Sequence, residues 1–203
     1  MPSFVKIRLS DMVKELGESE VKTILSSFVC DKNEDVQTFI REKAIKFSEC
    51  GWAKTTLVYW VSDDEKEKYL VGYYTIAPKY ICVSKDVVSA NLARKLNNHG
   101  KFDPNTREYV VPAPLIAQLG KNFADGNNYV IKGDELLRMA LDTVEKIQVE
   151  LGGKFIYLEC EEKEKLINFY ERNGFTNFGK RKVDRDEVGV DGEYLVQFLK
   201  YMK

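Results

Sequence analysis

Histidine and cysteine are scarce in this sequence of 203 residues. His99 is the only histidine, and the four cysteines, Cys30, Cys50, Cys82 and Cys160, are widely separated and form no CxxC pair. The sequence therefore offers few residues from which a zinc site or a Ser-His-Asp triad could be built. We expect no metal site, and four reduced thiols in a cytoplasmic protein instead of a disulfide framework.

Long apolar runs and an excess of charge of one sign are also missing. The longest apolar runs, such as 110–117, are too short to span a membrane, and this one contains two prolines. The N-terminus lacks the basic-then-apolar pattern of a signal peptide. The 31 basic and 32 acidic residues leave a formal net charge of −1, so non-specific nucleic-acid binding is not indicated, although a local basic patch could exist. We expect no membrane contact.

The composition is otherwise that of a folded protein, with 44% hydrophobic, 31% charged and 12% aromatic residues. Runs of β-branched and aromatic residues predict strands at 55–61, 69–77, 154–160, 175–181 and 194–201, with 79–83 continuing the second strand. Apolar residues at helical spacing predict helices at 11–16, 19–28, 33–50, 85–96, 133–151 and 162–171. We expect Ser84 to cap the fourth helix and 101–107 to form a polar loop.

This order of elements predicts an α/β (α+β) fold, with three layers around a mixed central sheet. We expect one domain over residues 1–203, with residues 1–32 as an N-terminal helical extension packed on it.

The functional prediction starts from residues 109–150. Their pattern predicts an apolar strand, a loop rich in glycine and asparagine, and a long amphipathic helix. The helix opens on Gly133, Asp134 and Glu135. A glycine turn at a helix start gathers backbone N–H groups at the positive end of the helix dipole, which suits a phosphate or pyrophosphate. The two acidic residues would repel a phosphate unless their side chains point away.

Three segments resemble motifs of the GNAT superfamily, the acetyl-CoA-dependent N-acetyltransferases. The segment 166–175 (LINFYERNGF) resembles the family's FYxxxGF signature. The segments 72–77 (GYYTIA) and 111–119 (VPAPLIAQL) resemble the GYYxLA and xPxxLLGRLA strands of a bacterial and phage toxin-like sub-group. The resemblance covers roughly residues 39–203. In the phosphate loop, only Gly133 matches the family pattern Q/R-x-x-G-x-G/A.

The resemblance implies a splayed central sheet, acetyl-CoA as co-substrate and direct acetyl transfer to a primary amine. It implies that Tyr170 acts as general acid toward the thioester sulfur. It also implies that backbone groups of Leu119, Gly120 and Lys121 hold the pantetheine arm and polarise the carbonyl. The remaining expected cofactor contacts lie around the pyrophosphate, at Asn128, Ile131, Lys132, Gly133, Asp134 and Glu135.

Each of these residues also has a plainer interpretation. Tyr170 could be a core or surface tyrosine, and Cys160 is better explained as a small buried thiol than as an acetylated nucleophile. No general base stands out, because Gln118 cannot take a proton efficiently and the distance of His99 from the site is not given by the sequence.

We therefore expect an N-acetyltransferase that acts on a small-molecule or peptide amine, in a pocket bordered by the N-terminal helices, the 72–77 strand and the loop near Val188. A toxin-like transferase acting on aminoacyl-tRNA is the alternative within enzymes, and tRNA is the only nucleic acid that we consider as a partner. A non-catalytic CoA-binding or interaction module on the same fold is the alternative outside them. A homodimer is compatible with either.

Overall fold

The computed structural model describes residues 3–184, 187, 189 and 191–202. The chain divides into two compact units, one formed by Met1–Ala77 and Ala117–Leu141 and the other by Pro78–Ile116 and Asp142–Lys203. Strand β7 (Leu115–Lys121) and helix α6 (Gly133–Leu151) each begin in one unit and end in the other. Among the described residues, no helix has the length and apolar character needed to cross a membrane.

The first unit contains an antiparallel group of strands. These are β1 (Ser3–Arg8), β2 (Lys54–Val61) and β3 (Lys68–Ala77), followed by the end of β7 beside β3. The sequence patterns predicted β2 and β3 as a hairpin, which is confirmed, but they did not predict β1. Gly72 in β3 permits a close approach, since a Cβ there would lie 2.8 Å from the Gly120 carbonyl oxygen and 3.1 Å from Leu136 Cδ2.

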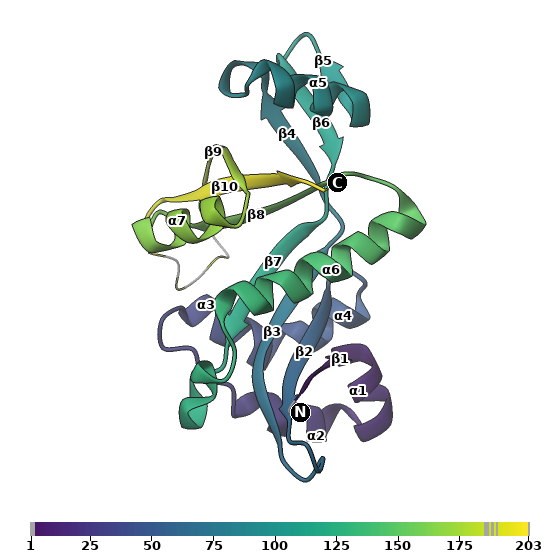
Figure 1. Cartoon of the computed structure of the whole chain (residues 1–203), viewed down its shortest axis with the longest axis vertical. Coiled ribbons are helices and arrows are strands. Elements are labelled where there is room, and N and C mark those ends of the chain that lie inside the picture. The colour runs from purple at the N-terminus through teal and green to yellow at the C-terminus, as the bar shows by residue number, and fades with distance from the viewer. Residues whose placement is uncertain (1–2, 185–186, 188, 190, 203) are drawn as a thin grey trace. The chain divides into compact units, whose positions relative to one another are not determined.

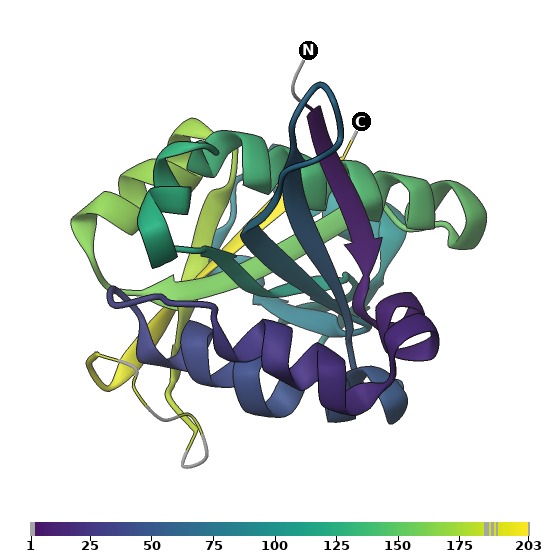
Figure 2. The ribbon, with the colours of Figure 1, turned by 90° about the horizontal axis from the view of Figure 1, so that it is seen from below.

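The N-terminal helices lie together along one face of β1–β3 (Figure 2). They are α1 (Leu9–Leu16), α2 (Glu18–Ser26), α3 (Glu34–Thr38), the π-helical turn η1 (Phe39–Lys43) and α4 (Ala44–Glu49). The Asn33 side chain caps α3 by accepting a hydrogen bond from the Val36 N–H at 3.0 Å. The apolar faces of these helices form a core with Phe28, Leu57 and Tyr73, whose side chains are fully buried.

The second unit contains β8 (Phe155–Glu161), α7 (Glu164–Arg172), β9 (Thr176–Lys182) and β10 (Tyr194–Tyr201). Strand β10 lies between β8 and β9 and is antiparallel to both. The first two residues of β7 pair with β8 in parallel, and β7 then continues for five residues beyond that pairing. The strands and helix predicted within residues 154–201 are confirmed to within two residues at each end.

A separate three-stranded sheet corrects several expectations for residues 78–116. It consists of β4 (Tyr80–Ser84), β6 (Glu108–Pro112) and β5 (Lys101–Asp103), with the short turn η2 (Lys85–Val87) and helix α5 (Ala90–His99) beside it (Figure 1). The segment 79–83 therefore does not continue β3, and 101–107 is not purely a loop. Ser84 caps only η2, whereas Ser89 caps α5 by accepting from the Leu92 N–H at 3.3 Å.

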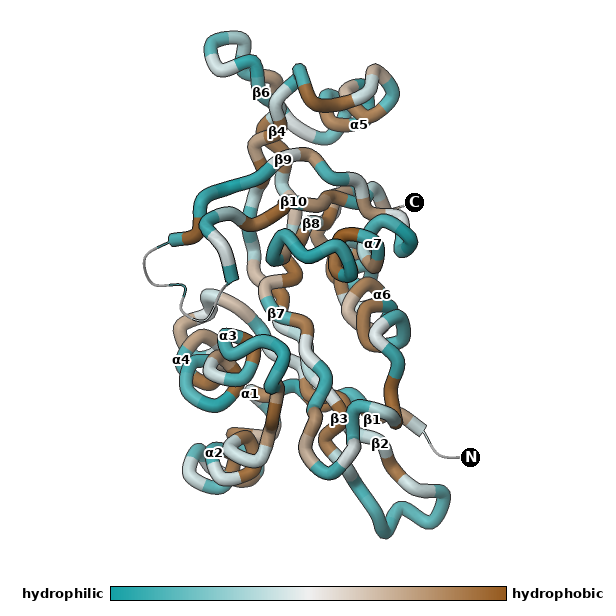
Figure 3. The backbone as a smooth tube through the Cα atoms, turned by 90° about the vertical axis from the view of Figure 1, so that its left-hand side faces the viewer, coloured by the Kyte–Doolittle hydropathy of each residue, from teal (hydrophilic) through white to brown (hydrophobic). Residues whose placement is uncertain are grey.

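The predicted strand that starts at Tyr109 is in fact two strands in two sheets, β6 and β7. Proline lacks the backbone N–H that pairing in a sheet requires. Pro112 and Pro114 lie where the chain leaves β6 and enters β7, so one strand does not run through this segment. The larger sheet has the order β1-β2-β3-β7-β8-β10-β9 and is mostly antiparallel, so the expected mixed α/β fold is confirmed. The segment η3 (Ala124–Tyr129) joins β7 to α6; it is 3₁₀ in character but kinked at Asp125 and Gly126, which have positive φ. Hydrophobic and hydrophilic positions alternate along α6, as expected for an amphipathic helix (Figure 3).

Candidate active site

The end of β7 lies directly against helix α3. A Cβ at Gly120 would lie 2.3 Å from Val36 Cγ1 and 3.3 Å from Tyr73 Cε1, so only glycine fits there without a shift of the helix. The Tyr73 hydroxyl donates a 2.6 Å hydrogen bond to the Val36 carbonyl and ties α3 to β3. The backbone segment Leu119–Lys121, which we expected to hold pantetheine, therefore packs closely against α3, and α3 is itself held in place by Tyr73.

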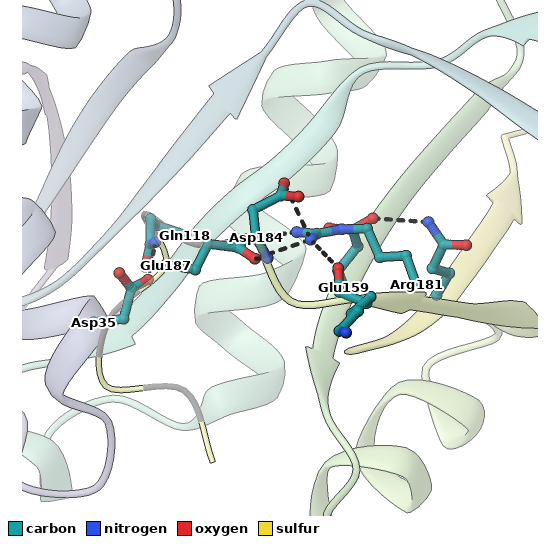
Figure 4. Close-up of polar contacts among 8 residues, drawn as sticks. Asp35, Gln118, Glu159, Arg181, Asp184 and Glu187 are labelled. Carbon is teal, nitrogen blue, oxygen red and sulfur yellow. Dashed lines mark hydrogen bonds and ion pairs between the residues drawn. The ribbon is translucent and has the colours of Figure 1, made fainter. Parts of the chain in front are cut away.

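One polar contact joins the same helix to the same strand. The Gln118 side-chain amide donates a hydrogen bond to Asp35 Oδ2 at 2.7 Å (Figure 4). Both side chains are half-buried. The sequence patterns placed Asp35 only within a helix expected at 33–50, and the 83 residues that separate it from Gln118 concealed the contact.

Asn122 is a buried polar residue that fixes the segment after β7. Its Nδ2 donates to the Leu70 carbonyl at 2.8 Å, and its Oδ1 accepts from the N–H groups of Val29 at 2.9 Å and Ala124 at 3.1 Å. Its own N–H donates to the Val71 carbonyl at 2.9 Å. No local pattern in the sequence marks this role of Asn122.

Lys121 shapes the loop that precedes α6. Its Nζ donates to the carbonyls of Asn128 at 2.7 Å and Ile131 at 3.2 Å. Partial burial, together with the positive charge of Lys32, lowers the pKa of the Lys121 ammonium. Asn128 and Ile131, expected as cofactor contacts, thus use their carbonyls to hold this lysine.

Helix α6 begins at Gly133 as expected, but its first turn contains a contact of its own. Glu135 Oε2 accepts a 2.8 Å hydrogen bond from the Lys132 N–H. The Lys132 carbonyl accepts from the N–H groups of Glu135 and Leu136, each at 3.1 Å. Asp134 lies in the same turn. One amide expected for the pyrophosphate is therefore taken by a carboxylate of the chain itself, which an incoming phosphate would have to displace.

Tyr170 lies on α7 in the second unit and is buried. Its ring packs against those of Phe169, Phe175 and Phe198, with centroids 5.0–6.0 Å away. Burial, and to a lesser degree the neighbouring Cys160, raises the pKa of the Tyr170 hydroxyl well above its usual range. The phenol is therefore protonated at neutral pH, as a general acid must be.

The residues that we considered as a general base, a nucleophile or a pocket border lie as follows. His99 ends α5 and lies beside Tyr201, with 3.4 Å between His99 Nε2 and the Tyr201 hydroxyl. Cys160 is buried in β8, and burial raises the pKa of its thiol to about 12, so the thiol is neutral. Val188 lies outside the described residues. Within the described part of the chain, no group of three His, Cys, Asp or Glu side chains could hold a metal ion.

A cluster around Arg181 in the second unit was not expected from the sequence (Figure 4). Its guanidinium contacts Glu159 Oε2 at 2.7 Å and both carboxylate oxygens of Glu187, at 2.5 and 2.9 Å. These hydrogen bonds and charges raise the pKa of Arg181. Burial would raise the pKa of Glu187, but its contacts with Arg181 and the Asp184 N–H lower it overall. The cluster fastens the segment after β9 to β8.

No family model matches the sequence, and no curated protein matches it. Solved structures do resemble the fold. A tyrosine-to-phenylalanine mutant of KacT has a TM-score of 0.62 at 15% identity, covering 97% of this chain and 94% of that one. AtaT complexed with acetyl-methionyl-tRNAfMet has a TM-score of 0.61 at 15% identity, covering 96% and 94%. AtaTR bound with acetyl-CoA has a TM-score of 0.56 at 16% identity, covering 95% and 91%. The chain has a GNAT fold.

KacT and AtaT are toxin acetyltransferases with this fold, so the expected resemblance to a toxin-like GNAT sub-group is confirmed at the level of the fold. Strand β7 and helix α6 flank the loop in which the sequence resemblance led us to expect pyrophosphate contacts. Tyr170 lies on the helix that carries the FYxxxGF resemblance. The assigned roles of the site residues stay predictions.

Proposed function

We propose that this GNAT-fold chain is an acetyltransferase that moves the acetyl group of acetyl-CoA to an amine. The observation that carries the proposal is the similarity, over nearly the whole of both chains, to AtaTR bound with acetyl-CoA. A second structure, a mutant AtaT toxin bound to the C-terminus of the antitoxin AtaR and acetyl-CoA, is similar over 98% of this chain with a TM-score of 0.56.

In the proposed reaction, the lone pair of a neutral amine forms a bond to the thioester carbonyl carbon, and the C–S bond breaks. Backbone groups of Leu119–Lys121 hold the pantetheine arm, and amides of Lys132–Glu135 meet the pyrophosphate. Tyr170 gives its proton to the departing thiolate, the nitrogen loses one proton to water, and the phenolate regains its proton from water. The FYxxxGF resemblance around Tyr170 supports this role, whereas the raised pKa opposes it, because a thiolate, with a reference pKa of about 8.5, is a weaker base than the phenolate that would form.

Aminoacyl-tRNA is the acceptor that the comparisons support. AtaT was solved with acetyl-methionyl-tRNAfMet, and its fold matches this chain with a TM-score of 0.61. The α-amino group of an aminoacyl ester has a reference pKa of about 7.7–8.0, so a sizeable fraction is already neutral near pH 7.5. Small-molecule and peptide amines stay as alternative acceptors.

A non-catalytic CoA-binding or interaction module is the second candidate function, and the first turn of α6 favours its interaction form. Glu135 occupies the Lys132 N–H, and this carboxylate opposes an incoming phosphate by charge. An interaction module would need no anion site, whereas the FYxxxGF resemblance around Tyr170 favours an enzyme.

A thiol-release assay tests the proposal. Acetyl-CoA is incubated with the full-length protein and with methionine methyl ester, short peptides or charged tRNA, and free CoA thiol is measured. We expect acceptor-dependent release that Tyr170→Phe lowers by at least about 10²-fold, the usual contribution of a general acid. Tyr109→Phe is the matched control, because Tyr109 is a buried tyrosine in the core of the small sheet.

Two results would contradict the assignment. Full turnover by Tyr170→Phe would remove the proposed acid from the mechanism. Tight binding of acetyl-CoA and of desulfo-CoA without thiol release for any acceptor would support the non-catalytic module instead.

A further inference from the structure

The contact between α3 and β7 places a carboxylate beside the strand that is expected to hold the thioester. We propose that Asp35 binds the ammonium group of the acceptor and later takes a proton from its nitrogen. This inference rests on the proposed acetyltransferase function and adds a residue that recognises the acceptor.

Two independent contacts place Asp35 next to the end of β7. Gln118 and Gly120 are two residues apart on one strand, so they face the same side of the sheet. Val36 packs on the face of Gly120, where a Cβ would be 2.3 Å from its Cγ1. Asp35, the residue before Val36, bonds to Gln118 on that same face. The carboxylate therefore lies on the α3 side of the backbone segment Leu119–Lys121.

The position of Asp35 is fixed by its surroundings. The Asn33 side chain caps the helix, and the Tyr73 hydroxyl holds the Val36 carbonyl at 2.6 Å. The α3 N–H groups favour a negative charge in this first turn. These contacts hold the carboxylate with little freedom, which is what a group that orients a substrate requires.

The charge of Asp35 is available for a cation. In the part of the chain that the structure describes, its side-chain partner is the neutral amide of Gln118, and no lysine or arginine forms an ion pair with it. The amide engages Oδ2 alone, and a carboxylate has about four lone-pair sites on its two oxygens. Tyr73 is a titratable group close to Asp35, and its pKa is raised by burial first and then by the Asp35 charge.

The chemistry of an α-ammonium group suits this carboxylate. The group donates charge-assisted hydrogen bonds to Asp35 and loses its first proton to water, because its reference pKa is about 7.7–8.0. Once the nitrogen has bonded to the acetyl carbon it carries a positive charge, and its next proton passes to Asp35. The C–S bond breaks, and the thiolate takes a proton from Tyr170. The Asp35 carboxyl releases its proton to water, and the phenolate regains a proton from water. Overall, the ammonium and the thioester give an amide, a CoA thiol and one proton.

The role of Asp35 is tested most directly by measuring acceptor binding to the complex with desulfo-CoA, which has no thioester and cannot react. Full-length protein is saturated with desulfo-CoA, and methionine methyl ester is titrated by calorimetry. The companion ligand is the same ester with a hydroxyl in place of the ammonium. We expect the wild type to prefer the ammonium ligand by roughly tenfold or more, and Asp35→Asn to lose that preference, because one hydrogen bond to a charged group is lost.

The matched control is Glu34→Gln, which removes an exposed negative charge from the same turn of α3. This variant should keep the wild-type preference, and Asp35→Glu should recover part of it. In turnover, Asp35→Asn should lower kcat/KM for the ester by roughly tenfold to a hundredfold and leave KM for acetyl-CoA within about twofold.

The outcomes separate this inference from the proposed function. A wild type that binds both ligands equally, or an Asp35→Asn variant that keeps the preference, overturns the role of Asp35 even if acetyl transfer occurs. An equal change of KM for acetyl-CoA and for the ester would also overturn it, since it would indicate a structural role. Failure of the proposed function would be recognised separately, as a wild type that does not bind desulfo-CoA, or that binds it but releases no thiol from acetyl-CoA with any acceptor.

Discussion

Replacing Asn122 by alanine should destabilise the protein strongly. The side chain is 2% exposed and makes hydrogen bonds to Leu70, Val29 and Ala124, which come from three different segments of the first unit. Each such bond contributes about 0.5–1.5 kcal/mol net, and a buried group left without its partner costs about 1–3 kcal/mol. We expect Asn122→Ala to lower the free energy of unfolding by about 2–5 kcal/mol.

Urea denaturation followed by fluorescence measures this change, and thermal unfolding gives a second value. For a chain of this length, the expected loss corresponds to a fall in Tm of about 5–15 °C. Asn105→Ala is the control, because Asn105 is exposed and only its backbone N–H makes a hydrogen bond, to Asp103. A loss below about 1 kcal/mol for Asn122→Ala would show that these bonds do not hold the three segments together in solution.

Four further predictions concern the close contact at Gly120, the first turn of α6 and the cysteines. Gly120→Ala should lower the free energy of unfolding, measured by urea denaturation, by about 1–3 kcal/mol, because the new methyl group clashes with Val36. The double variant with Val36→Ala should recover much of that loss, and additive losses in the two variants would refute the close contact. Glu135→Gln should tighten acetyl-CoA binding by roughly threefold to tenfold in calorimetry, because it removes a carboxylate from the start of α6, and weaker binding would contradict this. Iodoacetamide at about pH 8 should label the exposed Cys50 and spare Cys160 until the protein unfolds. Because the folded pKa of Cys160 is raised from 9.0 to about 12, the stability linked to its neutral thiol should fall as pH rises through that interval, and a flat profile would refute the shift.

Elements with strong local patterns were predictable from the sequence. Strand β10 was predicted with its observed bounds, and the start of α6 at Gly133 was expected from the glycine before a clear amphipathic stripe. The division between β6 and β7 was missed, because a proline-containing apolar run does not show which sheet each half joins. Strand β1 was missed because its six residues alternate weakly and most of them are exposed.

Candidate site residues that lie in one continuous segment could be predicted from the sequence. Those that depend on tertiary contacts could not. The segment 119–121 and the turn at Gly133 could be marked as candidates from local sequence. The contact of Asp35 with Gln118 and that of Arg181 with Glu159 could not, because 83 and 22 residues separate the partners. Nothing in the local pattern around Glu135 showed that its carboxylate would turn back to the Lys132 N–H, although the risk from acids in that turn was clear.

Amide hydrogen exchange with and without acetyl-CoA tests the central claim most directly, since it reports where the co-substrate binds. The account predicts slower exchange on addition of acetyl-CoA in peptides that contain Leu119–Lys121 and Lys132–Glu135, with little change in β1 or in the small β4-β6-β5 sheet. Binding that leaves both of those segments unprotected would contradict it.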